Sequence, residues 1–181
     1  MRTILLALLL LVAGCGCVSV PSHNALQDFY VNIQAFSPAG GRICSGTKTG
    51  PAELTTAKHC VSGYALKLVN GVAVSVAGIR YKGEDEAVVT LSKPMFKAWA
   101  KRGPTPNPGD RVRYWGTPLG IPNVYREGIV VAVTDKVIAA DLRVCHGDSG
   151  AGLFNDRGEM VGVVVAMLPE QNKCSFMVGQ R

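Results

Sequence analysis

Apolar and polar residues alternate with a period of two through most of the chain beyond residue 28. Such segments, bounded by glycine, proline or asparagine, are typical of strands that bury one face. The expected strands are 31–36, 64–69, 72–76, 87–91, 111–115, 128–133, 137–140, 152–154 and 161–166. Asn70-Gly71 predicts a hairpin turn, and residues 156–158 predict a turn before the last strand. Helical periodicity is weak, with at most one turn expected near 95–100, so the pattern predicts an all-β fold.

A proline-rich stretch divides this pattern into two parts. Residues 99–110 contain three prolines and two glycines, a density that excludes the interior of a helix or strand. We therefore expect a first β unit at 29–98, a linker at 99–110 and a second β unit at 111–181.

The N-terminus has the features of an export signal. Its apolar run, residues 4–13, is shorter than the roughly 20 residues needed to span a membrane. The following Ala13-Gly14-Cys15 resembles a bacterial lipobox, which implies a signal at 1–14, a lipid on the Cys15 thiol and a tether at 15–28. The expected product is a membrane-anchored lipoprotein facing the periplasm or the cell exterior. An ordinary secretory signal cut nearby is the alternative.

Composition and charge narrow the function classes. The chain is 48% hydrophobic with 21 glycines, which indicates a folded, loop-rich protein rather than a disordered one. Its formal net charge of +6 comes from scattered residues, without a dense Lys/Arg tract interleaved with aromatics. No nucleic-acid partner is therefore expected.

Three separate blocks carry residues suited to nucleophilic catalysis. His59 lies in Thr-Thr-Ala-Lys-His-Cys, Asp85 in Asp-Glu-Ala-Val-Val and Ser149 in Cys-His-Gly-Asp-Ser-Gly. A serine hydroxyl needs a neutral imidazole to accept its proton, and a carboxylate orients that imidazole. The order His, Asp, Ser is a recurring serine-hydrolase arrangement. Glu84 is the alternative carboxylate if the register differs by one residue.

The positions of the histidines exclude other serine hydrolases. An α/β-hydrolase places its catalytic histidine after the serine. The histidines here, His23, His59 and His146, all precede Ser149. His146 is too near Ser149 along the chain to act as its base.

Export would place four further cysteines in an oxidising compartment, where disulfides persist. Cys44, Cys60, Cys145 and Cys174 allow three pairings. A zinc site that combines these cysteines with His59 or His146 is the competing interpretation. It lacks the C-x-x-C or H-x-x-x-H spacing typical of zinc ligands, so neither a metal nor a cofactor is expected.

The three blocks resemble those of trypsin/chymotrypsin-like serine peptidases in their compact bacterial and viral form. The resemblance extends over about 31–178, and segments 108–110 and 116–120 are also similar to the HtrA protease domain. It implies two six-stranded antiparallel β-barrels with the active site between them. The cysteine spacings of 16 and 29 residues match trypsin-like enzymes, implying the disulfides Cys44–Cys60 and Cys145–Cys174.

The same resemblance implies roles at the site. The backbone N–H groups of Gly147 and Ser149 would form the oxyanion hole, and Asp148 would shape that loop. Arg143 would lie at the base of the primary pocket and favour acidic substrates. The alternative is that Arg143 points outward, leaving an apolar pocket near Val165, Ala166 and Met167. No Ile-Val-Gly-Gly activation sequence precedes the first strand, so something other than a freed N-terminus must hold Asp148.

The sequence thus predicts a serine endopeptidase that acts through an acyl-enzyme on protein or peptide substrates. Two other functions stay open. One is a catalytically silent, lipid-anchored binding module on the same fold, and the other is a basic lipoprotein that tethers anionic polymers.

Overall fold

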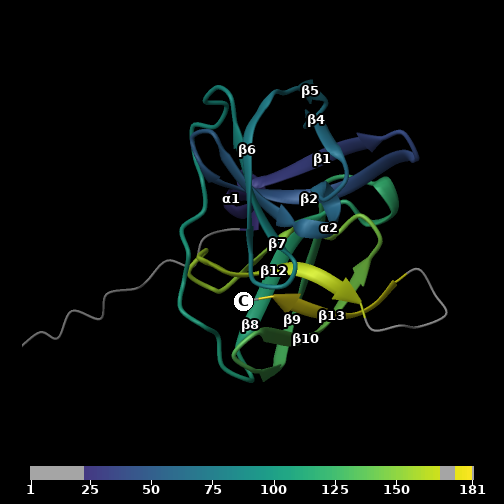
Figure 1. The fold of residues 1–181 in the computed structure, drawn as a ribbon. Helices are drawn as coiled ribbons and strands as arrows, with labels where there is room; N and C mark the ends of the chain where they lie inside the picture. The colour runs from purple at the N-terminus through teal and green to yellow at the C-terminus, as the bar shows by residue number, and fades with distance from the viewer. Residues whose placement is uncertain (1–22, 168–173, 181) are drawn as a thin grey trace, which may run out of the picture.

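The computed structural model describes residues 23–167 and 174–180, which form two β-sheet halves stacked on each other (Figure 1). The first half contains β1 (Tyr30–Ser37), β2 (Gly40–Gly50), β3 (Glu53–Ala57), β4 (Ala65–Val69), β5 (Val72–Ala73), β6 (Val76–Lys82) and β7 (Glu86–Leu91). The second contains β8 (Arg111–Gly116), β9 (Val124–Val133), β10 (Val137–Cys145), β11 (Gly152–Phe154), β12 (Met160–Met167) and β13 (Cys174–Gln180). The described helices are short: α1 (His23–Gln27), α2 (Lys58–Val61) and the 3₁₀ turn η1 (Pro118–Gly120).

The first half is a seven-stranded antiparallel sheet with the strand order β5-β4-β1-β2-β3-β7-β6. Its β4–β5 turn is the expected hairpin, because Asn70 and Gly71 have φ of 50° and 77°, the left-handed conformation that a tight turn of this kind requires. The two-residue strand β5 makes seven strands where six were expected.

The second half closes into a six-stranded barrel in the order β10-β13-β12-β11-β8-β9. The predicted all-β fold of two antiparallel units is therefore confirmed. Each half has its own buried apolar cluster, and the two clusters include Ile33, Leu54 and Val89 in the first half and Ile138, Leu153 and Val164 in the second.

A third apolar cluster attaches the N-terminal segment to the second half. Leu26 of α1 is almost fully buried against Phe154, Met160 and Val163. The Phe29 ring stacks on Phe154 at a centroid distance of 6.0 Å. This packing anchors the start of β1.

The segment between β7 and β8 runs along the outside of both halves (Figure 1). Ala100 N donates to Lys48 O at 2.9 Å in the first half, and Gly103 N donates to Met160 O at 2.9 Å in the second. The proline-rich segment is therefore bonded to both sheets. Residues 95–100 adopt no helical structure, so the helical turn expected there was wrong.

Several strands were missed by the alternation pattern. β2 is an example, since Cys44, Ser45, Gly46 and Thr47 are buried in succession. A strand that packs on both faces shows no period of two. β3, β13 and most of β6 were missed as well. The single strand expected at 72–76 is interrupted between β5 and β6, and β9 and β10 are longer than expected.

No helix in the described part of the chain is long and apolar enough to cross a membrane. The predicted signal (1–14) and the lipidation residue Cys15 lie outside the described residues. Lipid anchoring and export therefore stay predictions.

Candidate active site

His59 and Asp85 are brought together by the pairing of β3 with β7. The register places Ala57 opposite Glu86, so α2, which follows β3, lies beside the turn that precedes β7. His59 Nδ1 lies 2.6 Å from Asp85 Oδ2, and His59 N donates to Asp85 Oδ1 at 2.8 Å. Lys58 N also donates to the Asp85 carbonyl at 2.9 Å. Both the ring and the backbone of His59 are thus fixed by one carboxylate.

The protein stabilises the ionised form of Asp85. Burial alone would raise its pKa, but the hydrogen bonds from the His59 ring and N–H, with electrostatic attraction to His59 and Lys58, hold the pKa below its usual value. Glu84, the alternative carboxylate, instead pairs with Lys136 at 2.8 Å on the surface. The geometry therefore favours Asp85 over Glu84 as the partner of His59.

Ser149 lies in the turn between β10 and β11, at the boundary of the two halves. Its carbonyl accepts a hydrogen bond from Ser45 N in the first half at 2.9 Å. The next amide, Gly150 N, donates to Val164 O in the second half at 2.7 Å. The peptide unit between Ser149 and Gly150 is therefore bonded to both halves, so the position of Ser149 depends on how the halves dock.

His59, Gly147 and Ser149 line one cavity of about 590 Å³. Ile43 and Arg42 of β2, together with Val144, His146 and Val165 of the second half, form other parts of its wall. The His59 side chain is 40% exposed, which leaves it accessible from this cavity. The structure thus brings residues from all three sequence blocks to one site.

The turn at residues 145–150, here called the oxyanion loop, has a defined peptide orientation. His146 O accepts a hydrogen bond from Leu119 N at 2.6 Å. In a trans peptide the C=O and the following N–H point in opposite directions, so Gly147 N–H points away from Leu119. Gly147 has φ of +99°, and a Cβ there would lie 2.1 Å from Thr117 O, so only glycine fits.

Asp148 stabilises the oxyanion loop through buried hydrogen bonds. Its side chain is fully buried, and Oδ2 accepts hydrogen bonds from Tyr114 Oη and Cys145 N, both at 2.9 Å. Burial raises the pKa of Asp148 to about 6, although these bonds and Arg126 counteract it. Burial and the negative charge of Asp148 likewise raise the pKa of Tyr114. Buried groups of the second half thus hold Asp148 in the way that a freed N-terminus would otherwise have to do.

Disulfides frame the site. Cys44 is bonded to Cys60, as the resemblance to trypsin-like enzymes implied. Cys145 is also disulfide-bonded, and its Cα partner across the β10–β13 ladder is Cys174. Ligand atoms of Cys44, His59 and Cys60 lie within 4.8 Å of one another, but sulfurs bonded to each other cannot serve as thiolate ligands. These residues therefore do not fit a zinc site.

The structure describes the predicted primary-pocket residues only in part. Val165 lines the cavity, while the side chains of Ala166 and Met167 lie outside the described part. Arg143 lies on β10 with an exposed side chain, and the described residues that line the cavity do not include it. Its predicted contact with acidic substrates stays a prediction.

Sequence reasoning missed the residues that support the oxyanion loop. Ser45 Oγ donates to Gly147 O at 2.8 Å, and Thr117, Leu119 and Tyr114 contact the same loop. These residue types are common in strands and turns. Their one sequence signal is the resemblance of segment 116–120 to the HtrA protease domain, which does not identify these contacts.

Comparisons with solved structures support this architecture. The HtrA-type protease AlgW with a tripeptide is similar with a TM-score of 0.73 and 18% identity, over 88% of this chain and 60% of that chain. The active form of the Rv3671c protease from M. tuberculosis gives 0.74 and 17%, over 90% and 80%. The serine endoprotease from Yersinia pestis gives 0.68 and 20%, over 89% and 64%. At these identities the likeness shows the fold, and the chain spans 60% of the AlgW chain.

Sequence comparison gives the family. A search of curated protein sequences finds no match. The family model described as "Trypsin-like peptidase domain" matches residues 44–163, more than half of the chain, and this range includes His59, Asp85 and Ser149. The chain belongs to the trypsin-like peptidase family, which the resemblance of its motifs predicted.

Proposed function

We propose that the protein hydrolyses peptide bonds in protein substrates through a Ser149–His59–Asp85 triad and an acyl-enzyme intermediate. The observation that carries the proposal is the 2.6 Å contact between His59 Nδ1 and Asp85 Oδ2, in a cavity that His59 and Ser149 both line. This contact commits Nδ1 to Asp85 and leaves Nε2 available to the Ser149 hydroxyl.

In the first half-reaction, Ser149 Oγ attacks the scissile carbonyl as His59 Nε2 accepts its proton. The C–O bond forms and the carbonyl oxygen becomes an oxyanion. The imidazolium then gives its proton to the leaving amine, the C–N bond breaks, and an ester on Ser149 remains. Water, deprotonated by His59, attacks the ester and releases the acid. Serine regains its proton, so the enzyme is unchanged.

Asp85 and the backbone amides lower the barriers of these steps. The ionised Asp85 holds the His59 tautomer and stabilises the imidazolium without taking up its proton. The Gly147 and Ser149 N–H groups stabilise the oxyanion, and removing one donor of this kind costs about a hundred- to a thousandfold in rate.

For substrate choice, we propose a preference for Asp or Glu before the scissile bond if Arg143 reaches the bound side chain. The described wall, with Val144 and Val165, supports the alternative of small apolar side chains. Cleavage of a peptide library separates the two, since an acidic preference requires cuts after Asp or Glu that Arg143→Ala removes.

For location, we propose export and lipid attachment at Cys15. Mass spectrometry of the protein from a bacterial membrane fraction tests this proposal. A Cys15→Ala variant that stays in the membrane fraction would contradict it.

The activity is tested with a fluorophosphonate probe, which modifies only an activated serine. Labelling is expected in the wild type and absent in Ser149→Ala, whereas Ser92→Ala, which removes an exposed hydroxyl outside the cavity lining, should label normally. Labelling that persists in Ser149→Ala would refute the assigned nucleophile. A folded wild type that is never labelled would favour the silent binding module.

A further inference from the structure

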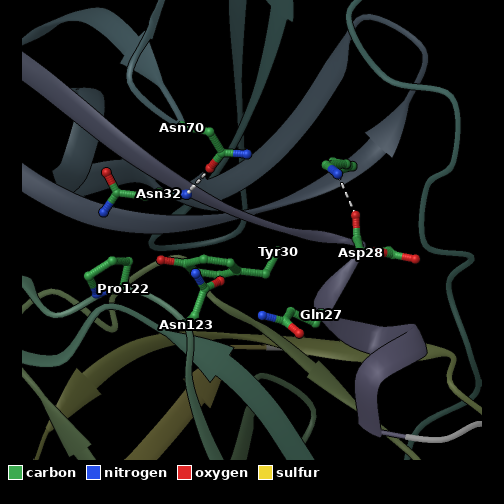
Figure 2. Close-up of a pocket in the computed structure, with 8 residues that line it drawn as sticks. Gln27, Asp28, Tyr30, Asn32, Asn70, Pro122 and Asn123 are labelled. Atoms are coloured by element: carbon green, nitrogen blue, oxygen red, sulfur yellow. Dashed lines mark hydrogen bonds between the residues drawn. The ribbon is translucent and has the colours of Figure 1, made fainter.

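A chain of hydrogen bonds runs from a second, polar cavity to the oxyanion loop. This cavity has a volume of about 360 Å³ and lies between β1 and the turn that precedes β9. Tyr30 and Asn32 reach it from β1, and Asn123 borders it from the other half (Figure 2). Residues of the active-site cavity do not line it.

The first links converge on Thr117, which is fully buried. The Tyr30 hydroxyl forms a hydrogen bond with Thr117 Oγ1, and Asn32 Nδ2 donates to the same oxygen at 3.2 Å. Thr117 Oγ1 in turn lies 3.3 Å from Ser45 Oγ, and Ser45 is also fully buried. The last link is the 2.8 Å bond from Ser45 Oγ to Gly147 O.

The Ser45 hydroxyl is the donor that links Thr117 to Gly147. A hydroxyl donates a single hydrogen, and the Gly147 carbonyl can only accept. Ser45 Oγ is the donor toward both Gly147 O at 2.8 Å and Thr117 Oγ1 at 3.3 Å, so its single hydrogen lies mainly on the nearer Gly147 carbonyl. Thr117 Oγ1 also accepts from Asn32 Nδ2 and forms a hydrogen bond with the Tyr30 hydroxyl, so several contacts hold it beside Ser45. These contacts fix the buried side chains of Thr117 and Ser45, and so keep Ser45 Oγ in place to donate to Gly147 O.

This chain constrains one side of Gly147, and a different bond constrains the other. Ser45 holds the carbonyl of Gly147, while Leu119 N holds the carbonyl of His146. The peptide planes before and after Gly147 are thus both fixed. Glycine has little intrinsic preference for one φ, so without these bonds the peptide could rotate and withdraw its N–H from the oxyanion.

We propose that Ser45 and Thr117 are positioning residues for the oxyanion hole. They act through Gly147 and do not touch the substrate. The proposal rests on the proposed function, because it assigns Gly147 N–H to the oxyanion. It predicts that loss of either hydroxyl weakens binding of the transition state more than binding of the substrate.

The decisive variants are Ser45→Ala, which removes the last link, and Thr117→Val, which removes a hydroxyl with little change in shape. Each should lower kcat roughly three- to tenfold with KM nearly unchanged, the loss expected for one hydrogen bond. Affinity for a peptide boronic acid, which forms a tetrahedral adduct on the serine, should fall by the same factor. Thr117→Ser keeps the hydroxyl and should restore kcat.

A matched control separates positioning from stability. Thr55→Val removes another buried hydroxyl, which contacts Thr49 at 3.2 Å within the first sheet, and should lower the melting temperature without changing kcat. The double variant Ser45→Ala/Thr117→Val should lose less than the product of the single losses, because both break one chain.

A readout independent of turnover is the amide exchange of Gly147 by NMR in a Ser149→Ala background. Ser45→Ala should accelerate this exchange, and Thr55→Val should not. Unchanged kcat and unchanged exchange in folded Ser45→Ala and Thr117→Val would overturn the proposal while leaving the triad intact. Wild-type protein without fluorophosphonate labelling would instead refute the proposed function itself.

Discussion

The Arg102 guanidinium donates a hydrogen bond to the buried carboxylate of Glu86. Glu86 directly follows Asp85, and Arg102 belongs to the segment that joins the halves, so this pair fastens the segment beside the site. Arg102→Met leaves the Glu86 carboxylate buried without its partner and should lower the free energy of unfolding by roughly 1–2 kcal/mol, since Arg102 is partly solvated. Urea unfolding measures this loss.

The control for this prediction is Glu86→Gln/Arg102→Met, which removes both charges and should be more stable than the single variant. If the double variant is as unstable as Arg102→Met, the buried charge is not the cause.

Asp85→Asn tests the electrostatic part of the site. An Asn side chain cannot stabilise the imidazolium and favours the wrong tautomer of His59, so kcat should fall by about 10⁴-fold, the effect known for this substitution in a triad. Steady-state kinetics measure the loss, and circular dichroism should show an unchanged fold. Glu84→Gln, which breaks only the surface pair with Lys136, should retain activity. Equal losses in both variants would contradict the assignment.

The raised pKa of the buried Asp148 carboxyl predicts how the stability of the fold depends on pH. Its pKa is raised from 3.8 to about 6 in the folded state. Between these values the folded protein binds more protons than the unfolded chain, so this group's contribution to stability falls as pH rises through that window. The contribution should fall by about 1–3 kcal/mol across the window and then level off.

The measurement is the difference in urea unfolding free energy between wild type and Asp148→Asn from pH 4 to pH 7. Other titrating groups cancel in this difference. Parallel curves for the two proteins would show that Asp148 does not titrate in this range.

Motif chemistry explains why the catalytic candidates could be predicted. Proton transfer needs particular side chains, and His59, Asp85 and Ser149 are recognisable because few other residues can replace them. The Cys44–Cys60 pair followed from the family spacing. Alternation located strands such as β1, β4, β7 and β8, and proline density located the segment between β7 and β8 that lacks regular strands.

The supporting residues could not be predicted because their roles depend on contacts across the interface. Ser45 lies in β2, where four successive buried residues conceal the strand pattern. Its hydroxyl reaches Gly147, more than a hundred residues later, and only the docked halves define that contact. Arg143 shows the same limit, since its place in the sequence did not reveal that its side chain is exposed.

Gly150 should tolerate no side chain. It has φ of +91°, and a Cβ would lie 2.1 Å from Thr56 Oγ1 and 2.2 Å from Ser45 O. Gly150→Ala should therefore destabilise the fold by about 3 kcal/mol or more and abolish labelling of Ser149, because strain adds to displacement of the interface. Thermal unfolding and probe labelling measure the two effects.

Gly63 supplies the matched control, since it also has a positive φ, +75°, but a Cβ there meets nothing within 4 Å. Gly63→Ala should cost only about 1 kcal/mol, the conformational term alone. Equal destabilisation of the two variants would show that the close approach at Gly150 is unimportant.

The Ser149 carbonyl is held by one half and the next amide by the other. A nascent chain in which a single half has folded would hold its nucleophile at one end only. Hydrolytic activity would then appear only when the two halves have docked, and it would not require cleavage of an inhibitory segment. During refolding, labelling of Ser149 by the fluorophosphonate probe should begin later than the burial of Trp115. Labelling that begins before Trp115 is buried would contradict this order of events.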